Sequence, residues 1–112
     1  MIVEEGEVRA EEWRMDDRIA VEQLAALVRD YASGRESDVA AGRETPRLAA
    51  LLVQKYGWGV HDAAVALFGS ERARPVIDAA DQAMVSIDPD WRRHDRERWE
   101  ARPADLASGS SA

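Results

Sequence analysis

The chain has 112 residues, with 22 acidic and 15 basic side chains, a formal net charge of −7 and no cysteine. The length predicts a single domain, and the lack of cysteine excludes a disulfide framework and a thiolate metal site. The acidic balance disfavours nucleic acid and anionic membranes as partners. No apolar run is long enough to span a bilayer and the N-terminus has no signal-peptide pattern, so we expect a cytoplasmic protein with no membrane contact.

The first helical pattern follows an acidic N-terminal stretch. Residues 1–15 are predicted to form an arm or an extension of the next helix. That helix is predicted to run from Asp16 or Asp17 to Tyr31, with two carboxylates at its positive N-terminal end. Its apolar residues recur at helical spacing: Val21, Leu24, Val28 and Tyr31, with Leu27 beside them. Residues 33–44 are rich in glycine, serine and charged side chains, and they predict a loop.

Residues 45–69 carry the clearest pattern in the chain. Thr45 is a good N-cap, and Pro46 suits the first turn of a helix. Four apolar residues then share one helical face: Leu48, Leu51, Leu52 and Tyr56. Gly57 is able to adopt the left-handed conformation that ends a helix, and a second apolar helical pattern extends over 60–68. The sequence therefore predicts a tight helical hairpin at the centre of the core.

Two further proline-marked helix starts follow, at Pro75 and Pro89. Residues 75–87 are amphipathic, whereas 89–102 are mostly charged. Residues 103–112 are predicted to be a disordered tail. The sequence thus predicts an all-α fold: a single-domain bundle of about five helices over residues 16–102.

The last predicted helix also carries the candidate functional residues. Trp91 and Trp99 lie eight residues apart on one face of a polar helix, so their rings either pack on the core or bind a partner. In the second case we expect apolar anchors with an acidic rim: Trp13, Trp91 and Trp99, with Glu11, Glu12, Asp16 and Asp17. This pattern favours a non-catalytic protein–protein interaction protein, such as an adaptor, an accessory subunit or an inhibitor of a larger complex. Its partner would be another protein or a second copy of the chain.

A DNA-binding regulator is the alternative, because the 46–87 region resembles a helix-turn-helix module. That resemblance implies a basic nucleic-acid-binding set: Arg47, Lys55, Arg72 and Arg74. The second helix of such a module presents polar side chains to base edges. Residues 60–68 offer only His61 and Asp62 for that purpose, so the pattern favours the interaction protein.

Signals for catalysis or metal binding are weak. His61 and His94 have no third ligand at a metal-binding spacing. Asp90 and His94 are four residues apart, which is typical of a surface hydrogen bond. Asp78 and Asp81 would share a proton only if they were buried, and the amphipathic pattern predicts that they face water. No phosphate-binding loop or nucleophile elbow occurs, and we expect no enzymatic activity, metal or cofactor.

Overall fold

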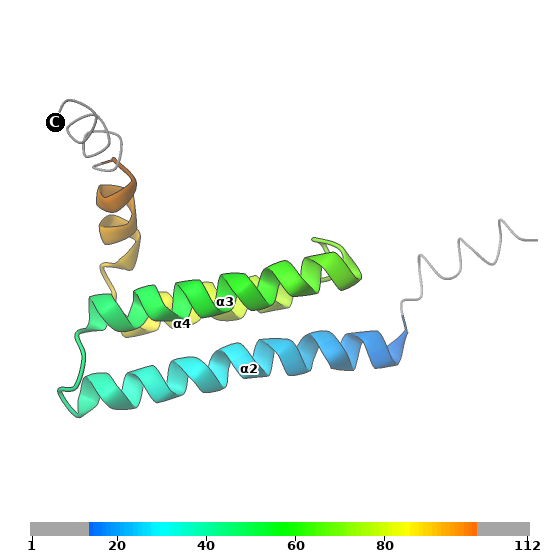
Figure 1. The fold of residues 1–112 in the computed structure, drawn as a ribbon, viewed down its shortest axis with the longest axis horizontal. Coiled ribbons are helices and arrows are strands. Elements are labelled where there is room, and N and C mark those ends of the chain that lie inside the picture. Colours follow the sequence, from blue (N-terminus) through cyan, green and yellow to red (C-terminus); the bar gives the residue numbers. More distant parts are fainter. Residues whose placement is uncertain (1–13, 101–112) are drawn as a thin grey trace, which may run out of the picture.

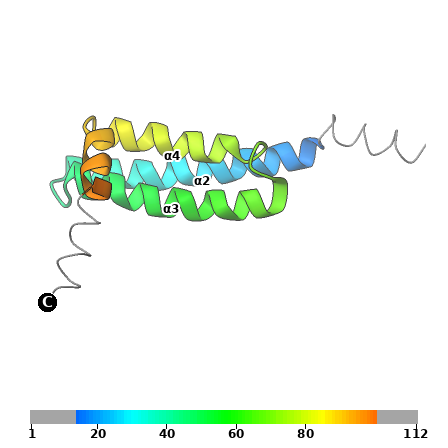
Figure 2. The same ribbon diagram turned by 90° about the horizontal axis from the view of Figure 1, so that it is seen from above.

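The computed structural model describes residues 14–100, which form helices and the turns between them. Helices α2 (Met15–Ala40), α3 (Pro46–Phe68) and α4 (Arg74–Ile87) lie side by side, and a further helix over residues 91–100 stands away from them (Figures 1 and 2). No strand occurs among these residues. The predicted all-α bundle is therefore confirmed, with four helices in the described part rather than five. The predicted tail and most of the predicted N-terminal arm lie outside the described residues.

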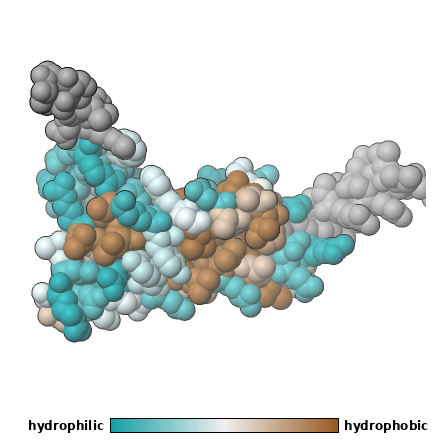
Figure 3. Space-filling model, viewed as in Figure 1, coloured by the Kyte–Doolittle hydropathy of each residue, from teal (hydrophilic) through white to brown (hydrophobic). Residues whose placement is uncertain are grey.

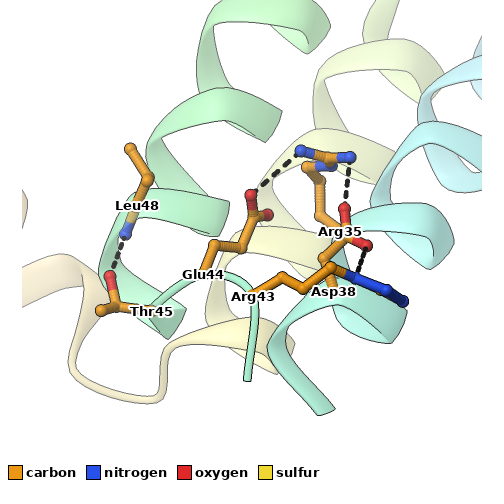
Figure 4. A network of polar contacts seen from close by, with 6 residues as sticks. All are labelled: Arg35, Asp38, Arg43, Glu44, Thr45 and Leu48. Carbon is orange, nitrogen blue, oxygen red and sulfur yellow. Dashed lines mark hydrogen bonds and ion pairs between the residues drawn. The ribbon is translucent and has the colours of Figure 1, made fainter. Parts of the chain in front are cut away.

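The predicted loop at 33–44 is wrong for residues 33–40, because α2 continues to Ala40, and only 41–44 form a turn. Ion pairs hold the end of this helix to the turn that follows it (Figure 4). The Arg35 guanidinium contacts an Asp38 oxygen at 2.6 Å and a Glu44 oxygen at 3.0 Å, and Arg43 contacts the other Asp38 oxygen at 3.2 Å. These charged residues look loop-like in sequence, but they stabilise a helix end and the reversal of the chain into α3.

Helix α3 begins at Pro46, as the sequence predicted. The Thr45 hydroxyl oxygen accepts a hydrogen bond from the Leu48 backbone N–H at 3.1 Å, and Pro46 occupies the first helical turn. The cap and the proline act locally, which is why the sequence identifies them.

The predicted tight hairpin is wrong, because α3 runs without interruption through Gly57-Trp58-Gly59. Among the described residues, positive φ angles occur only at Gly42 and Gly69, which follow α2 and α3. Gly57 remains helical, and a Cβ there would lie 2.6 Å from the Cβ of Ala80 on α4. This glycine allows α3 and α4 to approach each other closely and does not form a turn.

Helix α3 packs through its small side chains rather than through its leucines. Its buried residues are Ala49, Ala50, Val53, Gln54, Gly57 and Ala64. Leu48, which was expected in the core, is 46% exposed, and Leu51 and Leu52 are half-buried. Small residues at a helix contact permit a short distance between axes, so the three long helices enclose a narrow core whose largest fully buried side chains are valines.

The 91–100 helix is attached to the bundle at its first residue. Trp91 is 5% exposed and belongs to the hydrophobic core, whereas Trp99 is 48% exposed. Figure 1 shows the helix leaving the end of the bundle at which α4 stops and α3 begins. The corner between this helix and α3 forms the first of two candidate binding surfaces.

Candidate binding surfaces

The structure separates the predicted anchor residues. Trp91 packs inside the molecule and Trp99 is exposed on the 91–100 helix. Asp16 is exposed and Asp17 is half-buried at the start of α2, at the opposite end of the bundle from Trp91. Trp13, Glu11 and Glu12 lie outside the described residues. The described members of the predicted site therefore do not form one continuous surface.

A pocket of about 320 Å³, here called the corner pocket, lies between the start of α3 and the 91–100 helix. Seven residues line it: Thr45, Arg47, Leu48, Leu51, Trp91, His94 and Arg98. Figure 3 shows apolar surface at the base of the projecting helix. Because α3 packs through its small residues, Leu48 is exposed and Leu51 only half-buried, and both line this pocket.

Two polar networks hold the 91–100 helix in position. Asp88 is buried, and its Oδ2 lies 2.7 Å from His94 Nδ1 while its Oδ1 accepts the Asp90 backbone N–H at 3.1 Å. A carboxylate can only accept, so His94 Nδ1 donates to Asp88. The sequence suggested Asp90 as the histidine's partner, and Asp88 takes that place because its side chain caps the turn from which the helix starts.

Arg98 forms the second network. It donates to Gln54 Oε1 at 2.9 Å and to Asp95 Oδ1 at 2.5 Å, and its guanidinium lies 5.5 Å from the centre of the Trp91 ring. Arg98 and Gln54 are 44 residues apart in the chain, and no local pattern signals their contact. The bond ties the 91–100 helix to a buried side chain of α3.

The second candidate surface is apolar and lies along α2 and α3. The Tyr31 and Tyr56 rings stack with centroids 4.2 Å apart, which sets the register of these antiparallel helices. Beyond this stack, towards the start of α2 and the end of α3, apolar residues of both helices face the same side. These residues lie 4, 7 and 11 positions from Tyr31 and from Tyr56, so helical spacing places them on the side of the stack. We call them the α2–α3 apolar face: Ala20, Leu24, Leu27, Val60, Ala63 and Leu67.

The apolar face is incompletely covered. Leu27 is 48% exposed and Leu67 is 72% exposed, and Ala63 is exposed as well. Figure 3 shows a broad hydrophobic area on this side of the bundle. Exposed apolar patches of this kind mark sites of interaction with other molecules.

A second cavity, of about 310 Å³, lies between α4 and the 91–100 helix and has charged residues of both signs in its lining. Asp81 lines it, and partial burial, together with the nearby Asp78 carboxylate, raises the pKa of Asp81, while Arg92 and His61 oppose this effect. Asp78 and Asp81 are both exposed, as expected. Mixed charges in an open setting give this cavity no preference for one class of ligand.

The basic residues of the DNA-binding alternative do not gather. Arg47 lies at the start of α3, whereas Arg72 and Arg74 follow its end. A helix of 23 residues is roughly 35 Å long, so the uninterrupted α3 keeps Arg47 far from the other two. Lys55 is exposed between them.

Within residues 14–100, no cluster of three histidine or acidic side chains is arranged to hold a metal ion. The helices in this part of the chain are also too short or too polar to cross a membrane. Comparisons with protein-family models, with curated proteins and with solved structures found no match to the chain. Arguments about function therefore depend on the two surfaces themselves.

Proposed function

We propose that the chain is a non-catalytic protein-interaction protein that binds a helix of a protein partner on its α2–α3 apolar face. The observation that carries the proposal is the exposure of two large apolar side chains, Leu27 and Leu67, on two helices that pack against each other. Covering apolar side chains stabilises a complex by roughly 25 cal/mol for each Å² removed from water. An amphipathic helix of the partner is the element that fits a surface bordered by two helices.

Charges around the face indicate the chemistry of that partner. Asp16 and Asp17 begin α2 at the same end of the bundle as Leu67, and Asp62 is exposed on α3. Three basic residues lie at that end as well: Arg18 on α2, and Arg72 and Arg74 after α3. No lysine or arginine occurs in α3 after Lys55. A helix whose apolar side is bordered by lysine or arginine would be attracted by the net charge of −7, whereas a second acidic copy of the chain would be repelled.

The test compares capture of partners by the tagged full-length chain and by a Leu67→Glu variant, using nuclease-treated lysate of the native host. We expect the variant to lose a stoichiometric protein partner, because a carboxylate within an apolar contact would be desolvated. Ile19→Glu is the matched control. Ile19 is also 48% exposed on α2, but it lies roughly 80° around the helix from Leu27.

The outcomes of this experiment distinguish between the candidate binding sites. Loss with Leu67→Glu and retention with Ile19→Glu support the apolar face, provided that both variants melt at the wild-type temperature. Equal capture by Leu67→Glu and the wild type would contradict the proposal. Loss with Trp99→Ala alone would move the site to the 91–100 helix, and partners released by nuclease would favour the DNA-binding alternative.

A further inference from the structure

The corner pocket divides into an apolar side and a polar side. Leu48, Leu51 and Trp91 form the apolar side, and the polar lining consists of Thr45, Arg47, His94 and Arg98. No carboxylate lines the pocket. This is unusual in a chain of net charge −7, and it gives the pocket a chemistry different from that of the surrounding surface.

The carboxylates that contact His94 and Arg98 do not themselves line the pocket. Asp88 is buried and fixes His94 Nδ1, so the other ring nitrogen remains available. Arg98 contacts Gln54 and Asp95 through one of its terminal nitrogens, and a guanidinium has five N–H donors. Both side chains are thus held in place while they keep free polar atoms, which lowers the entropy cost of binding.

Arg47 supplies a positive charge at the start of α3. It is exposed, and it forms no ion pair with another residue in the range 14–100. Its backbone N–H is also open among these residues, because Thr45 caps the N–H of Leu48 and Pro46 has none. The positive end of the α3 dipole therefore adds to the Arg47 charge at one side of the pocket.

From this arrangement we infer that the corner pocket binds a small organic anion, namely a carboxylate attached to an aromatic or branched apolar body. The carboxylate would lie at Arg47 and the start of α3, and the apolar body against Leu48, Leu51 and Trp91. The volume is at the lower end of the range for ligand pockets, which suits a molecule with a single ring. This inference is independent of the proposed protein partner.

The test uses the purified full-length chain and phenylacetate, followed by two-dimensional ¹⁵N–¹H NMR. We expect saturable shifts of the Leu48 and Leu51 amides and of the Trp91 indole, with millimolar affinity. Arg47→Ala should weaken binding about tenfold, because it removes one charge-assisted hydrogen bond. Lys55→Ala is the matched control, since it removes an exposed cation of the same helix that does not line the pocket.

Neutral phenylacetamide separates recognition of the anion from apolar contact. Its affinity, measured from the same NMR signals, should be at least about tenfold lower than that of phenylacetate. Equal binding of the amide, equal losses in Arg47→Ala and Lys55→Ala, or shifts confined to the α2–α3 apolar face would each overturn the inference. So would an absence of shifts with phenylacetate. Because no protein partner is present, failure here leaves the proposed function intact.

Discussion

Gly57 and Gly59 are two residues apart in α3 and meet different surroundings. A Cβ at Gly57 would lie 2.6 Å from Ala80 Cβ and 3.5 Å from a Val28 methyl, whereas a Cβ at Gly59 would meet nothing within 4 Å. Gly57→Ala should therefore lower the free energy of unfolding by roughly 1–3 kcal/mol through overpacking. Gly59→Ala should raise it by roughly 0.5–1 kcal/mol, because alanine favours the helix.

Urea unfolding of the two variants, followed by circular dichroism, measures these changes. Changes of opposite sign in the free energy of unfolding would identify Gly57 as the contact residue between α3 and α4. If both variants lost stability equally, the close approach at Ala80 would not be the reason for the glycine.

The two glycines also show why the sequence predicted a hairpin that does not exist. A glycine that forms a turn and a glycine that admits a neighbouring helix look the same in a local pattern, and the flanking Trp58 suits either case. The deciding residue is Ala80, which lies 23 positions further along the chain than Gly57. Local signals do identify the Thr45 cap and the helix that begins beside Pro75, because those signals act within one turn.

At the scale of elements, the 91–100 helix depends on Trp91 for its attachment. Trp91→Ala would leave a cavity beside α3 and should lower the free energy of unfolding by about 3 kcal/mol. Trp99→Ala removes a ring that is about half exposed and should cost less than about 1 kcal/mol. Thermal unfolding by calorimetry distinguishes the two, and similar melting temperatures for both variants would contradict the burial of Trp91.

The candidate surfaces were only partly predictable, because they depend on how α3 is rotated about its axis. The leucine stripe at Leu48 and Leu51 predicted a core face, but α3 packs through small residues, which leaves Leu48 exposed and Leu51 half-buried at the corner pocket. The sequence identified Trp91 as a residue that needs a contact, because it is a large apolar side chain in a polar helix. The sequence did not identify Arg98 as part of this surface, because its hydrogen bond to Gln54 joins distant parts of the chain.

At the scale of the whole molecule, charge and the α2–α3 apolar face act in opposite directions. A net charge of −7 keeps copies of the chain apart at low ionic strength, while exposed Leu27 and Leu67 favour contact. Salt changes this balance, because the Debye length falls from about 10 Å at 0.1 M to about 3 Å at 1 M and the apolar attraction is not screened.

We therefore expect the purified chain to be monomeric in dilute buffer and to self-associate in 1 M NaCl, as measured by light scattering coupled to size-exclusion chromatography. Leu67→Glu should remain monomeric under both conditions, whereas Ile19→Glu should behave as the wild type does. A wild-type dimer at low salt that Leu67→Glu dissociates would show that two acidic copies pair on this face despite their charge. The occupant of the face would then be the chain itself, and a basic partner helix would no longer be needed to explain why Leu27 and Leu67 are exposed in the monomer.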